Sequence, residues 1–420
     1  MKTKISRFHA LSFAAAAMLL STLNAQLATC FAQGSLTPPG APAPTMKSLD
    51  QIEARTPIAS APFTITSPGS YYLTTNVTVS SGNAVTINAN NVTLDLGGFT
   101  ISSTENPAAN GNGVALGSPG PVANITILNG FISSGVTNNG SGTYTGTGFG
   151  FGIDYPAYAP SNMRVFGVSV TGCRLYGIYL GFNNTVVESC TVNTAGTYGI
   201  TAATVSDSVA RDSGSIAMYV NTAHNCVGYN LIGNGDGIDA TTAGNCFGFS
   251  GGSGYGINSA IAENCVGYSS GSGTGLYVLD SAVNCEGNSS SSYGLLATTA
   301  TGCYGNSLSG TGIYTDTAEN CYGSSAGGGD GIYAVTAQNC HGSSSTGTGL
   351  YAFRSAVSCY GQSAGASGVG LYVQTGVTMA SFGYNSTATG LGLQAYVATG
   401  CYGQNSSGTS ESINNKYNMP

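Results

Sequence analysis

Apolar and polar residues alternate over short stretches along most of the chain, and turns of Gly, Ser and Thr separate these stretches. One stretch is Gly331-Ile332-Tyr333-Ala334, and its counterpart in the next repeat is Gly349-Leu350-Tyr351-Ala352. A period of two is typical of a half-buried β-strand, whereas an amphipathic helix needs apolar residues at every third or fourth position. The pattern therefore predicts many short strands joined by tight turns.

The strands belong to a repeat of about 19 residues that extends from residue 173 to residue 401. Many units begin with Asn-Cys, continue through a Ser/Thr/Gly stretch and reach a Gly-Ile or Gly-Leu pair. Ser208 and Ser381 fill the two places where the series lacks a cysteine. The cysteines of the series are Cys173, Cys190, Cys226, Cys246, Cys265, Cys285, Cys303, Cys321, Cys340, Cys359 and Cys401.

Stacking of these units explains how they fold, because two short strands cannot bury an apolar face alone whereas stacked units bury a continuous core. The sequence predicts an all-β fold, a right-handed parallel β-helix (β-solenoid) with coils of about 19 residues. Cys and the Ile or Leu after Gly point inward in this prediction. The varying unit length argues against a left-handed helix, which needs a strict six-residue repeat.

An earlier and longer repeat begins at Asn91, with the sequence Asn-Val-Thr-Leu-Asp-Leu-Gly-Gly-Phe-Thr-Ile. Similar segments begin at Asn124 and at Asn162. Here the chain resembles the right-handed parallel β-helix repeat proteins of pectate-lyase-like architecture, over about residues 60–410. The stretch from Leu36 to Ile58 resembles that of many secreted bacterial proteins with such repeats. The resemblance implies the fold but no single activity, because this fold hosts lyases, hydrolases, adhesins and inert spikes.

The chain divides into five predicted segments. A basic start at Lys2, Lys4 and Arg7, followed by an apolar run of 11–23 and small residues, is typical of a secretory signal peptide. We therefore expect a secreted or cell-surface protein, with a lipid anchor at Cys30 as the alternative. The segments are 1–32, signal peptide; 33–59, proline-rich spacer; 60–170, N-terminal coils with long loops; 171–410, regular coils; and 411–420, C-terminal tail.

Composition narrows the function classes. Only 6% of the residues are charged, and the chain has 64 Gly and no Trp, so long surface helices are not expected. The net charge of −7 argues against nucleic-acid binding, because phosphates need a basic surface. No stretch beyond the signal peptide reaches the ~20 apolar residues of a transmembrane helix.

The cysteine series has three interpretations. Packing in the core is the favoured one, because free Cys is among the most buried residue types and Ser replaces it at two places. Disulfides between neighbouring coils are the second, since the protein is expected to be secreted. Metal binding is the third, although no Cys-x-x-Cys pair is present. The Asn before many of the cysteines predicts a left-handed turn, because Gly replaces it in two units.

Tyrosines form two predicted outward rows. Tyr277, Tyr314, Tyr333, Tyr351 and Tyr372 follow the inward Ile or Leu. Tyr304, Tyr322, Tyr360 and Tyr402 follow the inward Cys. Stacked rings stabilise a sheet face by themselves, and they also offer a platform for sugar rings; both interpretations stay open.

The best place for a site is the pair of long N-terminal loops, 102–123 and 133–161, because loops on a rigid scaffold often carry function. Aromatic rings with an acid and nearby Arg suit contact with carbohydrate, although the same rings could simply pack the loop onto the rod. We expect no cofactor and no metal, since the calcium-like stretch 233–239 does not recur. The candidate ligand-binding residues are Tyr144, Phe151, Asp154, Tyr155, Tyr158, Arg164 and Arg174.

The favoured function is that of a structural or adhesive protein that binds polysaccharide or a cell-surface glycan without catalysis. Catalytic motifs of the polygalacturonase type, such as Asp-Asp and Gly-His-Gly, are missing, and the acids are scattered. A polysaccharide lyase or glycoside hydrolase with its site at 133–174 is the alternative. The open ends of a solenoid also predict end-to-end self-association.

Overall fold

A computed structural model of the chain describes residues 54–117, 120–155 and 157–419. The predicted signal peptide, Cys30 and most of the predicted spacer lie outside the described residues. From Arg55 onward the chain forms one compact unit.

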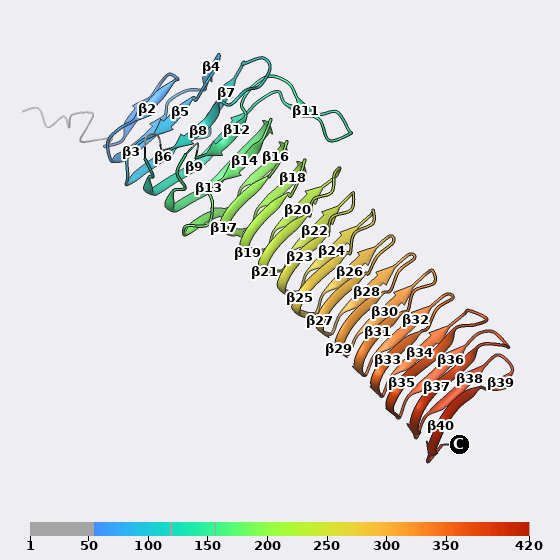
Figure 1. Ribbon diagram of the computed structural model, residues 1–420. Coiled ribbons are helices and arrows are strands. Elements are labelled where there is room, and N and C mark those ends of the chain that lie inside the picture. Colours follow the sequence, from blue (N-terminus) through green and yellow to red (C-terminus); the bar gives the residue numbers. More distant parts are fainter. Residues whose placement is uncertain (1–53, 118–119, 156, 420) are drawn as a thin grey trace, which may run out of the picture. The chain divides into compact units, whose positions relative to one another are not determined.

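Arg55–Pro420 is a right-handed parallel β-helix of about 18 turns, which confirms the predicted fold. Its strands run from β1 (Thr56–Ile58) to β40 (Glu411–Tyr417), and no helix occurs among the described residues. Figure 1 shows the coils stacked one after another along this unit. Within the described chain, two pairings are antiparallel, β10 with β11 and β38 with β39; the others are parallel.

Complete coils contribute to three parallel faces, which we call A, B and C in the order in which the chain passes through them; the first coil has strands in A and C. The early strands of face A are β1, β3 (Gly69–Leu73), β6 (Val92–Asp95) and β15 (Thr185–Glu188). Face C begins with β2 (Phe63–Ile65), β5 (Val85–Ile87), β8 (Asn112–Leu116), β12 (Phe151–Asp154) and β14 (Tyr176–Tyr179). Two long strands, β9 (Ala123–Ser133) and β13 (Ser161–Cys173), pass through both A and B.

Separate strands of face B are β4 (Val77–Val79), β7 (Thr100–Ser103), β16 (Thr191–Ala195), β18 (Val209–Ser213), β20 (Val227–Asn230), β22 (Phe247–Ser250), β24 (Val266–Ser269), β26 (Glu286–Ser289), β28 (Tyr304–Ser307), β30 (Tyr322–Ser325), β32 (His341–Ser344), β34 (Tyr360–Ser363), β36 (Phe382–Asn385) and β38 (Tyr402–Asn405). From β17 onward, one strand per coil passes through C and then through A. These strands are β17 (Ile200–Ser206), β19 (Met218–His224), β21 (Ile238–Gly244), β23 (Ile257–Glu263), β25 (Leu276–Val283), β27 (Leu295–Thr301), β29 (Ile313–Glu319), β31 (Ile332–Gln338), β33 (Leu350–Val357), β35 (Val369–Met379), β37 (Leu391–Thr399) and β40.

The core follows the predicted alternation. In β29, Ile313 is fully buried while Tyr314 points outward. The Gly before each inward Ile or Leu is required by close packing, because a Cβ at Gly294 would overlap the backbone of Asn306. The fully buried residues at the predicted inward position are Ile200, Ile238, Ile257, Leu276, Leu295, Ile313, Ile332, Leu350, Leu371 and Leu393.

The cysteine row lies between faces A and B. The cysteines from Cys173 to Cys401 are free thiols and are buried, as the packing interpretation expects. Ser208 and Ser381 occupy the predicted places in this row, where each hydroxyl accepts a hydrogen bond from the backbone N–H of a neighbouring cysteine. Burial raises the pKa of the Cys190 thiol to about 11, which keeps it protonated at neutral pH.

Cys173 does not belong to this row, and that part of the prediction was wrong. It pairs with Ala195 of the next coil, further along face B. In the coil before Cys190, the row position is occupied by Val168. Ser169, which follows Val168, pairs with Thr191, which follows Cys190. Counting cysteines alone misassigned the position because the coil that contains Cys173 is longer than the regular ones.

The turn before the cysteine row is left-handed, as predicted. Asn264 and Asn320 have φ of 53° and 54° there, and Gly302 has φ of 64°. A second left-handed Asn row lies at the start of face A in the early coils. Its side-chain amides donate hydrogen bonds from Asn124 to Asn91, from Asn162 to Asn124 and from Asn184 to Asn162, over 2.6–3.1 Å.

A buried polar row at the end of the face B strands was not predicted. Its hydroxyls, except that of Ser325, donate to carbonyls in the turn that leads to face C, as from Ser269 to Gly254 over 3.1 Å and from Ser289 to Gly273 over 2.7 Å. These bonds satisfy carbonyls that the turn would otherwise bury unpaired. The row consists of Asn230, Ser250, Ser269, Ser289, Ser307, Ser325, Ser344, Ser363, Asn385 and Asn405.

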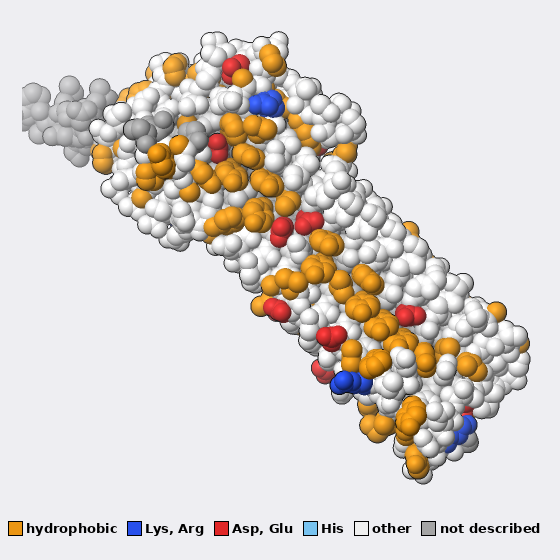
Figure 2. All heavy atoms as spheres, in the orientation of Figure 1, with side chains coloured by type: hydrophobic (Ala, Val, Ile, Leu, Met, Phe, Trp, Pro, Cys, Tyr) orange, Lys and Arg blue, Asp and Glu red, His pale blue; other side chains and the backbone are white. Residues whose placement is uncertain are grey.

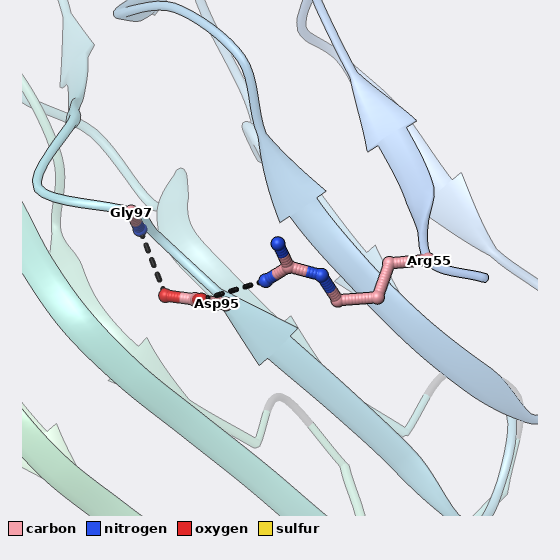
Figure 3. Close-up of polar contacts among 3 residues, drawn as sticks. All are labelled: Arg55, Asp95 and Gly97. Atoms are coloured by element: carbon pink, nitrogen blue, oxygen red, sulfur yellow. Dashed lines mark hydrogen bonds and ion pairs between the residues drawn. The ribbon is translucent and has the colours of Figure 1, made fainter. Parts of the chain in front are cut away.

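The two ends of the solenoid extend into segments that the sequence assigned to the spacer and to the tail. At the start, Arg55 forms an ion pair of 3.0 Å with Asp95, whose other oxygen accepts the N–H of Gly97 over 2.9 Å (Figure 3). At the other end, β40 pairs with β37 alone among the described strands, so one of its edges is open. No helix among the described residues is long and apolar enough to span a membrane.

Candidate functional site

The second long loop, 133–161, does two separate things. Its first part forms the hairpin of β10 (Thr137–Asn138) and β11 (Tyr144–Thr145), which projects beside the coils of β16 and β18 (Figure 1). The side chain of Asp212 on β18 holds this hairpin, since it accepts hydrogen bonds from Asn138 over 2.6 Å and from Tyr144 over 3.1 Å. Its second part returns to face C as β12.

A cavity of about 410 Å³ lies on the outer side of face C, where β8, β12 and β14 are neighbours. Aromatic rings form much of its wall, and amide and carboxyl groups lie between them. Its lining residues are Asn110, Asn112, Phe151, Asp154, Tyr155, Tyr176 and Tyr179.

Strand alternation directs Asp154 to this cavity. Ile153 points into the core and is fully buried, so the next residue faces outward. Asp154 is nevertheless only 5% exposed, because it lies in the aromatic-walled cavity. Burial raises the pKa of Asp154 to about 6, although a hydrogen bond from the backbone of Tyr155 works against the shift.

The rings on this part of face C stack on one another. The centroids of Tyr176 and Tyr179 are 4.6 Å apart at 19° between planes, and Tyr155 stacks on Tyr179 at 5.2 Å. Tyr176 also stacks on Tyr198 of the next coil at 5.7 Å and contacts Phe151 at 5.4 Å. The wall is therefore a connected and mutually supported aromatic surface.

Two further polar groups belong to the cavity. Asn112 is 2% exposed, and its side-chain oxygen has no hydrogen-bond partner in the described structure. A buried acceptor without a partner is costly, and a ligand hydroxyl donating to it would remove that cost. Arg174 donates a hydrogen bond of 2.9 Å to Asn110, which places its guanidinium beside the lining.

The structure brings together some of the predicted site residues. Phe151, Asp154 and Tyr155 line the cavity, and Arg174 contacts it through Asn110. The other three lie elsewhere. Tyr144 is buried in the hairpin, where it packs with Ala108 and Val136; Tyr158 is half exposed; and Arg164 lies on face A beside Thr126 and Val186.

Sequence reasoning missed Asn110, Asn112, Tyr176 and Tyr179. A signal for the tyrosines was present, because they flank Gly177-Ile178, a Gly-Ile pair of the kind that marks face C in later coils. The two asparagines had no such signal. They come from the first long loop, 102–123, and reach the site only because β8 is the neighbour of β12.

A separate cavity of about 540 Å³ lies between the hairpin and the turns at 214–216 and 232–236. Its walls are Gly, Ser, Asn and Ile, with Asp236 as the acid. That carboxylate accepts the N–H of Tyr255 over 2.7 Å, so its burial has a structural reason. Among the described residues, no group of three His, Cys, Asp or Glu is placed to hold a metal ion.

No protein-family profile matches the chain, and no curated protein matches it. Among solved structures, it is similar to the Azotobacter vinelandii mannuronan C-5 epimerase AlgE6 A-module, with a TM-score of 0.29 and 14% identity. The match covers 83% of this chain and 89% of that one. A TM-score of this size is too low to support an inference about this chain.

Proposed function

We propose that this chain is a secreted or cell-surface β-helix protein with a structural or adhesive role, and that it binds glycan in the Asp154 cavity. The observation that carries the proposal is a buried carboxyl group and an unpartnered amide oxygen, Asn112 Oδ1, within a wall of stacked tyrosines. Pockets that combine aromatic walls with a few convergent polar groups are typical ligand sites.

The chemistry of a sugar ring fits both the aromatic and the polar groups of this wall. A pyranose ring has C–H faces that pack on aromatic rings, and hydroxyls that donate to carboxylate and amide oxygens. The parts of the Tyr176 and Tyr179 rings that line the cavity, rather than the faces that they stack on each other, would contact the C–H groups. Asp154 and Asn112 would accept hydroxyl hydrogens. The cavity volume of about 410 Å³ is in the range of small-molecule sites.

Catalysis is the second candidate, because a carboxyl group with a raised pKa has the property of a general acid. Asp154, with its pKa near 6, could protonate a glycosidic oxygen. Hydrolysis of a glycoside also needs a second carboxylate within about 10 Å, and Asp154 is the one acid in the lining of this cavity. We therefore place binding first.

Affinity electrophoresis against a panel of plant, bacterial and algal polysaccharides tests the proposal. We expect retardation of the wild type by at least one glycan, and its loss in Tyr176→Ala. Tyr322→Ala is the matched control, since Tyr322 is an exposed ring on face B. Retardation that survives Tyr176→Ala, or no retardation by any glycan, would contradict the proposal.

An assay for products separates binding from catalysis. The same panel is incubated with wild type and Asp154→Asn, and reducing ends and unsaturated products are measured. No product is expected from either protein. Product from the wild type that disappears in Asp154→Asn would make the enzyme the correct assignment.

A further inference from the structure

Three hollows lie along one outward row of face C. The first contains Asp154 and Tyr179, the second Tyr277 and Tyr314, and the third Tyr372 and Gln394; their volumes are about 410, 270 and 80 Å³. Strand register connects them in a single line, which passes through Tyr179, Thr201, Tyr219, Asp239, Asn258, Tyr277, Leu296, Tyr314, Tyr333, Tyr351, Tyr372 and Gln394.

The line is long. Leu296 lies six coils after Tyr179, and Gln394 five coils after Leu296. At ~4.8 Å per coil, the hollows span roughly 53 Å. One small sugar fills one hollow only, whereas a polymer lying along the axis reaches all three.

The second hollow exists because the tyrosine row is interrupted. Tyr314 and Tyr333 stack at 4.7 Å and 1°, so their facing surfaces cover each other. Tyr277 stacks on Tyr255 at 4.9 Å on the side of β23, but its partner on β27 is Leu296, which has no ring. A gap of two coils, roughly 10 Å, thus separates Tyr277 from Tyr314. The ring of Tyr293, which precedes β27, lies 5.1 Å from Tyr314 and fills part of this gap. The space left for a sugar ring is the hollow of about 270 Å³ over Leu296.

The acidic side chains along face C limit which polysaccharides can bind there. Figure 2 shows hydrophobic side chains in a band along this unit, with acidic side chains beside it. Asp154 lines the first hollow and Asp316 the second, and Asp239 lies on the row between them. An acidic polysaccharide would bring like charge to these carboxylates, which is unfavourable. An uncharged chain offers hydroxyl donors to them without repulsion.

We infer that the ligand of face C is an uncharged polysaccharide that lies along the solenoid axis and occupies the Asp154, Leu296 and Gln394 hollows together. This inference rests on the proposed function, and it adds the substrate class and the length of the site. Contacts at three hollows act as linked binding events, so affinity rises steeply with chain length.

Leu296→Tyr tests the inference because it completes the tyrosine row and fills the second hollow while keeping the strand pattern. Leu308→Tyr is the control, since Leu308 is 58% exposed and lies in the turn after β28, outside face C. The probes are water-soluble glucomannan, xylan and mixed-linkage β-glucan, their oligosaccharides from the disaccharide upward, and polygalacturonate and alginate as acidic polymers.

We expect the neutral polymer to bind about tenfold or more tightly than its disaccharide. Leu296→Tyr should remove most of that gain and leave disaccharide binding unchanged, and Leu308→Tyr should change neither. Equal affinity for short and long neutral chains, no effect of Leu296→Tyr, or preference for polygalacturonate or alginate would overturn the inference while the Asp154 site stands. Absence of binding by every probe, short or long, would refute the proposed function itself.

Discussion

The early coils, up to β14, and the regular coils after them share the same three faces but differ in what those faces carry. In the regular coils, most inward positions repeat one residue type or a similar one, and rows of Cys, Ile or Leu, Ala and Ser fill the core. In the early coils, long loops interrupt the repeat and bring Asn112, Asp154 and Tyr176 to one cavity. The difference teaches that the regular repeat builds the scaffold, and that departures from the repeat create the polar and aromatic cavity.

The largest expected effect comes from breaking the regular core. Ile313→Ala should lower the free energy of unfolding by about 2–5 kcal/mol, because it leaves a cavity at a fully buried position. Denaturant unfolding followed by circular dichroism measures this change. Tyr314→Ala, on the outer side of the same strand, should cost less. If the two variants were equally destabilised, the inward assignment of Ile313 would be wrong.

The site itself is expected to cost stability. The folded-state pKa of Asp154, near 6, lies above its unfolded value near 3.9, so the folded state binds more protons between these pH values. The free energy of unfolding must therefore fall as pH rises from about 4 to about 6. Asp154→Asn should remove this loss and stabilise the protein by about 1–3 kcal/mol at pH 7.

Parallel unfolding curves of wild type and Asp154→Asn at pH 4 and pH 7 measure that effect. The difference between the two proteins should be small at pH 4 and larger at pH 7. Asp236→Asn, outside the cavity, should show the same kind of pH-dependent difference, because burial also raises the pKa of Asp236 to about 6. A wild type more stable than Asp154→Asn at pH 7 would show that the carboxylate is stabilised by its surroundings.

A smaller effect is expected at the left-handed turns of the regular coils. Asn264 has φ of 53°, so Asn264→Ala should cost about 1 kcal/mol, whereas Asn264→Gly should be close to neutral. Thermal unfolding of the three proteins compares them directly. Equal melting temperatures for the Ala and Gly variants would mean that the turn relaxes to another conformation.

The smallest effect is expected at the first coil. The Arg55–Asp95 ion pair is partly exposed, so Arg55→Ala should change the global free energy of unfolding by less than about 1 kcal/mol. Local hydrogen exchange in β1 should nevertheless become faster, because this pair attaches the first strand to β6. Arg55→Lys, which keeps the charge, should exchange at a rate between the two. Unchanged exchange in β1 would show that the pair contributes nothing there.

Much of the fold could be predicted from the sequence because the repeat determines it. A Gly-Ile pair marks the inward position of face C in each coil where it occurs, and an Asn-Cys pair marks the turn before face B. Strands, turns and inward positions could therefore be predicted from the period of the repeat. Cys173 shows the limit, since it matches the series by residue type but not by register. The buried polar row at the end of the face B strands was not predicted, because the sequence does not show which carbonyl a buried hydroxyl will bind.

The site could be predicted only in part. Asp154, Phe151 and Tyr155 were identified because they lie together in one aromatic loop. Asn112 was not, since it is separated from them by about 40 residues and becomes a neighbour only through the pairing of β8 with β12. Tyr144 was misleading for the opposite reason: it is close to the site residues in sequence, but its hydroxyl is bound to Asp212 on another coil.

Hydrogen–deuterium exchange with and without a bound glycan tests the central claim most directly. If the early coils hold the site, the bound polysaccharide should slow exchange in 110–116, 151–155 and 176–180, and Tyr176→Ala should abolish that protection. Protection confined to face B, or slower exchange that persists unchanged in Tyr176→Ala, would contradict the account.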